Sequence, residues 1–344
     1  MTWHKHCWFA LLLALCGFAS VARGGEGYRQ TNLVSDIPGL ATVTDPNLVN
    51  PWGVAVAAPT FLWVADNGTD ASTIYRADGT TARPAVAVNS APTGAVSNTS
   101  SNFAVSSGGS PFPALFIFAT EDGTILGWNP NVNPNEAVLA VPATGAIYKG
   151  LAIAGNRLYA TDFHNGRVDV FDGSFQPVNT PGAFVDPRIP AGYAPFGIQN
   201  VNGTIVVTYA KQDAEQHDDV PGQGHGFVDM FNTSGTFLGR VATHGQLNSP
   251  WGIAMAPANF GRFSGDLLVG NFGDGQISAF EPQGDGTFEL VGQLRSGAKA
   301  LSIDGLWALQ FGKGTVNNGP ANTLFFTAGP DGEHHGLFGT ITAG

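Results

Sequence analysis

Two stretches of this chain are near duplicates and decide its fold. The first reads PWGVA at 51–55, LWVAD at 62–66 and STIY at 72–75, and the second reads PWGIA at 250–254, LLVGN at 267–271 and QISAF at 276–280. Short runs of aliphatic, aromatic and β-branched residues, bounded by Gly, Asn and Asp, predict the strands of a small antiparallel sheet. The chain therefore contains a repeated β-unit.

The same unit recurs six times along the chain. Each copy opens with a glycine between apolar residues, and these glycines are Gly53, Gly94, Gly150, Gly197, Gly252 and Gly305. Their spacings of 41 to 56 residues match one blade of a β-propeller and exceed most helical repeats. The sequence predicts an all-β, six-bladed β-propeller of the NHL/lactonase type, with blades at about 48–90, 91–145, 146–190, 191–245, 246–298 and 299–344.

The two ends of the chain predict how the ring closes. After the third strand of the last unit, GLFGTI at 336–341, too few residues follow to form a fourth. The segment YRQTNLVSD at 28–36 precedes the first unit and has no other partner. We expect it to pair with the last blade, which would remove the open edges of the ring.

Composition and charge exclude several classes of protein. The 47 Gly and 22 Pro make up about 20 % of the 344 residues, against roughly 12 % in average proteins, which excludes a helical bundle. Charged residues are 12 % and hydrophobic ones 43 %, a composition that can bury a large core. The net charge of −11, with no cluster of Lys or Arg, argues against nucleic acid and anionic membranes as partners.

The N-terminal residues have the pattern of an export signal. Residues 1–22 combine a basic start, a short apolar run and small residues, which predicts a cleaved signal peptide and a mature domain of residues 23–344. Both cysteines, Cys7 and Cys16, fall within this signal, so the mature protein has no disulfides. We expect a secreted or periplasmic monomer without a membrane span; lipid anchoring at Cys16 is not expected, since a bulky Leu15 precedes it.

Several motifs resemble a known family. The runs NPWG at 50–53, YATDFHNGR at 159–167, GNFGDG at 270–275 and HGLFG at 335–339 are similar to those of an exported, largely uncharacterised bacterial family. That family is met in genomes with the PEP-CTERM sorting system and is related to NHL-type propellers. The resemblance implies a propeller fold and an exported location, but no activity. This chain ends ITAG without a Pro-Glu-Pro motif, so PEP-CTERM sorting is not implied here.

Residues just before the six opening glycines are expected to ring one end of the central channel. They are Trp52, Thr93, Lys149, Phe196, Trp251 and Asp304. Aromatic surfaces with a few convergent polar groups are typical of a ligand pocket. The alternative is that the aromatic residues fill the channel and that Lys149 pairs with Asp304 as a structural plug.

The loops above this ring carry the other candidate residues. Asp66 and Glu121 are candidate ligand-binding residues, because hairpin-turn geometry alone does not explain them. A long loop at 211–225 concentrates acidic residues and histidines, which suit Ca²⁺ or, with imidazole, Zn²⁺. The candidate metal ligands are Asp162, His164, Asp213, His217 and His334. No fixed-spacing metal motif is present, so a solvated acidic loop is the alternative.

Two functions stay open. The first is a binding module whose channel mouth and loops hold a small molecule, a glycan or an extracellular protein. The second is a metal-dependent hydrolase or lyase similar to six-bladed lactonases, with Asp304 at a ligand position. The chain has no Gly-x-Ser-x-Gly elbow, and the predicted mature domain has no cysteine, which argues against a serine or cysteine nucleophile.

Overall fold

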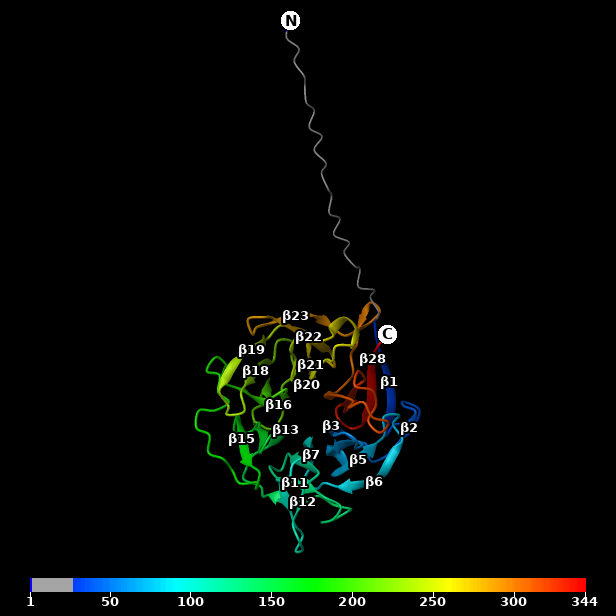
Figure 1. The fold of residues 1–344 in the computed structure, drawn as a ribbon, viewed down its shortest axis with the longest axis vertical. Helices are drawn as coiled ribbons and strands as arrows, with labels where there is room; N and C mark the ends of the chain where they lie inside the picture. The colour runs from blue at the N-terminus through cyan, green and yellow to red at the C-terminus, as the bar shows by residue number, and fades with distance from the viewer. Residues whose placement is uncertain (2–26) are drawn as a thin grey trace.

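The computed structural model describes Met1 and residues 27–344. Antiparallel sheets follow one another around a central axis in the order of the sequence (Figure 1). Within these residues there is no α-helix, and only two 3₁₀ turns occur, η1 (Asn67–Thr69) and η2 (Gly261–Phe263). The predicted all-β, six-bladed propeller is confirmed. The predicted signal peptide, with Cys7 and Cys16, lies outside the described residues apart from Met1.

In each blade the first strand lies innermost and the later strands follow outward. Blade one holds β3 (Pro51–Ala55), β4 (Leu62–Asp66), β5 (Ala71–Tyr75) and β6 (Thr81–Ala87), and blade two holds β7 (Pro92–Ser97), β10 (Phe116–Thr120), β11 (Ile125–Trp128) and β12 (Val138–Val141). Blade three holds only β13 (Tyr148–Ala154), β14 (Arg157–Asp162) and β15 (Arg167–Asp172), and blade four holds β16 (Tyr193–Val201), β17 (Thr204–Lys211), β18 (Phe227–Phe231) and β19 (Phe237–Thr243). Blade five holds β20 (Pro250–Met255), β21 (Leu267–Asn271), β22 (Ile277–Pro282) and β23 (Phe288–Gln293). Two small hairpins, β8 (Ala104–Val105) with β9 (Phe112–Pro113) and β24 (Arg295–Ser296) with β25 (Lys299–Ala300), lie between blade strands.

The sixth blade is built from both ends of the domain. Its inner strands are β26 (Leu306–Phe311), β27 (Leu324–Ala328) and β28 (Leu337–Ala343). Strand β1 (Tyr28–Ser35) pairs antiparallel with β28, with Tyr28 opposite Ala343 and Ser35 opposite Leu337, and β2 (Val43–Thr44) adds outside it. The predicted closure by the N-terminal strand is confirmed, and Figure 1 shows the C-terminus beside β1.

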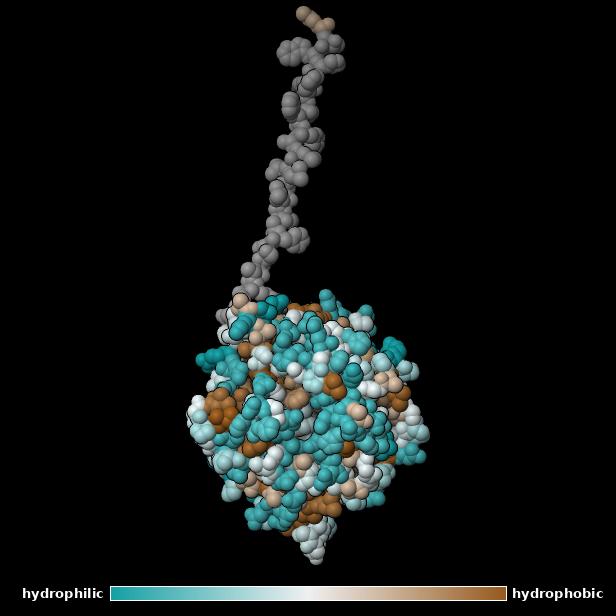
Figure 2. Space-filling view, turned by 180° about the vertical axis from the view of Figure 1, so that it is seen from behind, coloured by the Kyte–Doolittle hydropathy of each residue, from teal (hydrophilic) through white to brown (hydrophobic). Residues whose placement is uncertain are grey.

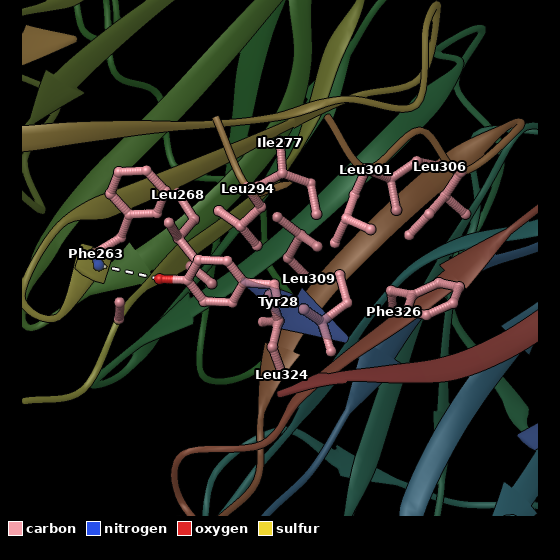
Figure 3. Close-up of a cluster of buried hydrophobic side chains, with 14 of the residues drawn as sticks. Tyr28, Phe263, Leu268, Ile277, Leu294, Leu301, Leu306, Leu309, Leu324 and Phe326 are labelled. Atoms are coloured by element: carbon pink, nitrogen blue, oxygen red, sulfur yellow. Dashed lines mark hydrogen bonds between the residues drawn. The ribbon is translucent and has the colours of Figure 1, made fainter. Parts of the chain in front are cut away.

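Tyr28 joins this closing strand to blade five. Its ring stacks on Phe263 at 5.8 Å and contacts Phe260 at 5.0 Å. Its hydroxyl donates to the carbonyl oxygen of Phe260 (2.9 Å) and accepts from the backbone N–H of Phe263 (3.0 Å). Figure 3 shows the side chain among leucines of blades five and six. A single side chain therefore satisfies its polar atom while filling the core between two blades.

The inner strands approach one another so closely that most need a glycine. A Cβ on Gly53 would lie 2.6 Å from the carbonyl oxygen of Thr93 in the next blade. Threonines of the second strands also stabilise the contacts between neighbouring blades. Thr161 Oγ1, for example, donates to the carbonyl of Phe196 in the next blade (2.7 Å). This packing aligns the six blades around the axis and fixes the residues that precede each glycine.

The surface is mainly polar on the face shown in Figure 2, where hydrophobic residues lie in small separate groups. No helix in the described part of the chain has the length and apolar character needed to span a lipid bilayer.

Candidate functional site

Four of the residues that precede an inner-strand glycine contact one another at the axis: Trp52, Lys149, Phe196 and Trp251. Thr93 is buried, and its Oγ1 donates to the carbonyl of Tyr148 in the next blade (2.7 Å). In the sixth blade Trp307 takes the position before the glycine, and Ala308 takes the place of the glycine. Ala308 N–H donates to Thr327 Oγ1 (3.0 Å), as Gly197 N–H donates to Thr208 Oγ1 (2.8 Å) in blade four. Gly305 instead has φ +65° and forms the turn before β26.

The expected place of Asp304 in this ring is therefore wrong. Asp304 is exposed, and its carboxylate accepts the backbone N–H of Asp331 (3.0 Å). The alternative pairing of Asp304 with Lys149 does not occur either, because Lys149 pairs with Glu121 and Asp218. The sequence signal that was missed is the Trp-small-aliphatic run WAL at 307–309, which matches WGV at 52–54 and WGI at 251–253.

Four aromatic residues close the channel, and we call them the aromatic plug: Trp52, Phe196, Trp251 and Trp307. Trp52 stacks on Trp307 at 3.6 Å, and Trp251 meets both indoles edge to face at 6.1 Å and 5.8 Å. Trp52, Phe196 and Trp307 are 1–2 % exposed and Trp251 is 8 % exposed. The predicted aromatic ring thus fills the axis instead of lining an open mouth.

A polar network lies against this plug, and we call it the axial network: Asn50, Asn67, Glu121, Lys149, Asp218 and Glu333. All six lie at the start of an inner strand or in the loop that follows a second strand, on the side of the ring that we call the loop face. Since the inner strands run in the same direction, residues of different blades meet there.

The axial network is continuous from blade six to blade four. Asn50 Nδ2 donates to Glu333 Oε2 (2.6 Å) and to Asn67 Oδ1 (3.2 Å), and Asn67 Nδ2 donates to Glu121 Oε2 (2.8 Å). Lys149 Nζ donates to Glu121 Oε1 (2.5 Å) and Asp218 Oδ1 (3.0 Å). Trp307 Nε1 donates to Asn50 Oδ1 (3.1 Å), which ties the network to the plug.

Lys149 is the buried centre of the network. Its side chain is 1 % exposed, and its ammonium lies 5.2 Å from the centre of the Trp52 ring. Burial acts to lower the pKa of Lys149, but the carboxylates of Glu121 and Asp218 outweigh it and raise the pKa. Burial likewise acts to raise the pKa of Asp218, yet Lys149 and His217 hold it below its ordinary value. Lys149 is therefore a permanent cation between two carboxylates.

Glu333 is held in a strained and desolvated position. Its φ of +71° lies in the left-handed region, which is uncommon for a residue other than glycine. Burial raises the pKa of its carboxyl, Asn50 opposes that shift by hydrogen bonding, and the charge of Glu121 adds to it. Asn50 also has a positive φ, of 44°. Backbone strain and perturbed acidity at one place are typical of functional sites.

An aromatic surface lies beside this network. Phe272, which follows β21 in blade five, stacks on Trp307 at 4.1 Å with an angle of 20° between the rings. Phe272 is half-buried, whereas the indoles beneath it are buried. The stack of Trp52, Trp307 and Phe272 thus ends in a ring that remains partly open to solvent.

Only one of the five predicted metal ligands belongs to a cluster of ligand atoms. His217, Glu121 and Asp218 place a nitrogen and two oxygens within 4.8 Å of one another. Asp162 is buried and accepts the backbone N–H groups of Ile147 and Asn165 as well as Asn165 Nδ2, which is a turn-forming role.

Of the remaining predicted ligands, His334 and Asp213 bond within their own loops, and His164 contacts the long loop of blade four. His164 Nδ1 lies 3.3 Å from the carbonyl of Gln216, and His334 Nδ1 lies 2.8 Å from the carbonyl of Asp331. Asp213 accepts the backbone N–H of His217 (2.8 Å). These three residues stay predictions as metal ligands.

Of the three acidic residues predicted to bind ligand, Asp66, Glu121 and Asp304, only Glu121 reaches the axial network. Asp66 is buried at the end of β4, where it accepts the backbone N–H of Thr73 (2.7 Å). Burial raises the pKa of Asp66 well above its ordinary value. Its surroundings are those of a carboxyl that organises the β4–β5 turn.

Sequence reasoning did not select six residues of this region as a site: Asn50, Asn67, Asp218, Phe272, Trp307 and Glu333. Asn50 precedes the PWG motif of the repeat, and Asp218 lies in the long acidic loop at 211–225. The contacts of Glu333 and Phe272 come from neighbouring blades, which sequence spacing does not reveal.

Six-bladed propellers of several activities have a similar fold. A streptogramin B lyase superposes with a TM-score of 0.51 and 12 % identity, covering 92 % of this chain and 97 % of its own. A glucose dehydrogenase superposes with a TM-score of 0.52 and 12 % identity, covering 92 % of this chain and 100 % of its own. A structure assigned as a gluconolactonase superposes with a TM-score of 0.55 and 14 % identity, covering 93 % of this chain and 92 % of its own. These similarities establish the fold alone.

Sequence relatives exist in a giant virus. One uncharacterised protein of Acanthamoeba polyphaga mimivirus is 37 % identical over 324 residues, covering 90 % of this chain and 78 % of its own length. A second uncharacterised protein of the same virus is 34 % identical over 329 residues, covering 90 % of this chain and 84 % of its own length. No established family profile matches the chain. The chain belongs to the same family as these two uncharacterised mimivirus proteins.

Proposed function

We propose that this protein is an exported binding propeller that holds a small amine-bearing ligand, such as an amino sugar of a glycan, on its loop face. One observation carries the proposal. Five of the six blades each contribute a polar side chain to the axial network, and blade five adds Phe272. Convergent polar groups beside an aromatic surface are typical of ligand sites.

The charge of the network selects the kind of ligand. Glu121, Asp218 and Glu333 outnumber the single cation Lys149, and the whole chain carries −11. Such a site attracts a cation and repels an anion. The half-buried ring of Phe272 offers a face to an ammonium group or to the apolar face of a sugar.

Binding is tested with glucosamine as the probe, using saturation-transfer NMR. Glu333→Gln and Asp218→Asn are expected to weaken the signal, because each removes a negative charge beside the ligand. Glu281→Gln, on the exposed end of β22, removes the same charge at a distance and serves as the control. Equal signals from all four proteins would contradict the proposal.

Export rests on the sequence alone. The basic start, apolar run and small residues of 1–22 support a signal peptide cleaved before a single domain of residues 23–344. The motifs shared with the exported bacterial family support the same location. N-terminal sequencing of the protein recovered outside the cytoplasm is expected to begin at Arg23. A mature chain that retains residues 1–22 would contradict export by this route.

A metal-dependent hydrolase or lyase is the second candidate, favoured by the cluster of Glu121, His217 and Asp218. A divalent cation would have to displace Lys149, which already bonds both carboxylates. Elemental analysis of residues 23–344, purified without chelator, distinguishes the two functions. The binding proposal predicts far less than one divalent ion per chain, and the enzyme requires about one.

A further inference from the structure

A cavity opens on the side of the ring away from the axial network. It has a volume of about 330 Å³ and is lined by all six inner strands. Its walls are residues farther along the inner strands than the axial ring, such as Val54 of β3 and Leu151 and Ile153 of β13. Because the inner strands start at the loop face, this cavity lies below the aromatic plug and opens on the opposite face.

The inner end of the cavity is aromatic. Trp251 is the plug residue that lines it, and the indole retains 8 % exposure. Its Nε1 is already used, since it donates to the carbonyl of Lys149 (2.9 Å). Trp251 therefore presents an apolar surface to the cavity, and Leu151, Ile253 and Leu309 are also among the lining residues. An apolar or aromatic group fits this end.

The rim of the cavity carries a cation without a counter-charge. Lys313 is the only charged residue among the described residues that line the cavity. No salt bridge to Lys313 occurs in the part of the chain that the structure describes. Lys313 is exposed at the rim, and partial desolvation lowers the pKa of its ammonium. In a chain of net charge −11, an unpaired lysine at a cavity mouth is a local site for an anion.

Amide groups complete the rim. The side-chain amide of Asn200 already has hydrogen-bond partners, because its Nδ2 donates to Ile153 O (2.8 Å) and its Oδ1 accepts from Gly203 N–H (2.9 Å). Gln199, by contrast, lines the cavity with no hydrogen bond of its side chain among the described residues. The Lys313 ammonium and the Gln199 amide are therefore both hydrogen-bond donors available to a ligand in this cavity.

We propose that this cavity is a second binding site, for small monocarboxylates with an apolar or aromatic body. The body lies against Trp251 and the aliphatic walls, and the carboxylate pairs with Lys313 at the rim. The volume lies at the lower end of the range for small-molecule pockets, about 300–1,000 Å³, so the ligand is small. The site is separate from the loop face and does not depend on the function proposed for it.

Three probes with the same ring and different charge test the assignment: phenylacetate, 2-phenylethanol and 2-phenylethylamine. Binding is followed by tryptophan fluorescence and by ligand-observed NMR. We expect phenylacetate to bind tightest, and Lys313→Gln to weaken it at least about tenfold, since a charge-assisted bond at the rim is lost. The affinity for 2-phenylethanol is expected to stay unchanged in that variant.

Matched variants keep the test decisive. Lys313→Arg retains the charge and is expected to retain phenylacetate binding, and Lys299→Gln removes an exposed lysine outside the cavity as a control. Glu333→Gln on the loop face is expected to leave phenylacetate binding unchanged, which separates this site from the axial network. No binding of phenylacetate in the millimolar range, or equal affinity in wild type and Lys313→Gln, would overturn the proposal.

Discussion

The ammonium of Lys149 lies 3.0 Å from the carboxylate of Asp218, so a buried cation on an inner strand is bonded by an exposed loop of the next blade. Glu121 bonds the same ammonium from the preceding blade. These two carboxylates are also members of the cluster of metal-ligand type that includes His217. The lysine thus places a fixed positive charge where the chain otherwise gathers ligands for a cation.

Replacing Lys149 should therefore convert this cluster into a cation site. Lys149→Met keeps the length of the side chain and leaves Glu121 and Asp218 without their shared partner. We expect a loss of about 2 kcal/mol in the free energy of unfolding, since a buried ion pair is broken. We also expect added Ca²⁺ or Zn²⁺ to raise the Tm of the variant and not that of the wild type. Lys299→Met is the control, and a variant indifferent to both ions would contradict this account of the cluster.

Trp307 and Asp304 should differ sharply in their contribution to stability. Trp307→Ala removes a stacked indole from the plug and is expected to cost about 3–5 kcal/mol. Asp304→Ala removes an exposed carboxylate with one hydrogen bond, from the backbone N–H of Asp331, and is expected to cost about 0.5–1.5 kcal/mol. Urea denaturation measures both. Similar costs would contradict the assignment of Trp307 to the axial ring.

The repeat could be predicted from sequence because it rests on local pattern. Strands, turns and glycines recur at blade spacing, and the N-terminal strand followed from counting the strands of the last unit. The prediction of the axial ring was wrong at Asp304. A glycine identifies the inner strand in five blades, but Ala308 takes its place in the sixth. The partners of Lys149 and Glu333 lie on other blades, so only the assembled ring reveals them.

The closing strand should depend on Tyr28. Tyr28→Ala is expected to cost about 3–5 kcal/mol, because it removes a ring packed between blades five and six. Tyr28→Phe should cost about 1–3 kcal/mol, because the carbonyl of Phe260 and the N–H of Phe263 lose their partner. Arg29→Ala, on the exposed side of the same strand, is the control. Denaturation midpoints of Tyr28→Ala and Arg29→Ala that coincide would refute the role of Tyr28.

Asp219 should make the protein less stable as the pH rises. Burial raises its pKa from the ordinary 3.8 to about 6, so the folded chain retains a proton that the unfolded chain releases near 3.8. Stability is therefore lost between about pH 4 and pH 6 as the folded carboxyl is forced to ionise. Asp219→Asn should remove this loss and gain at most about 3 kcal/mol at pH 7 relative to pH 4.

Thermal melts of wild type and Asp219→Asn from pH 4 to pH 7 measure this difference. Glu215→Gln, exposed in the same loop, is the control. A difference in stability between wild type and Asp219→Asn that does not change with pH would show that the carboxyl ionises normally in the folded protein.

The measurement that tests the central claim most directly is calorimetric titration of the wild-type domain with glucosamine and with N-acetylglucosamine. The two sugars differ chiefly in the charge of the amine, which the acetyl group removes. The account predicts that glucosamine binds at least about tenfold more tightly, since the axial network carries an excess of negative charge. Equal affinities, or no heat with glucosamine, would contradict an amine-binding loop face.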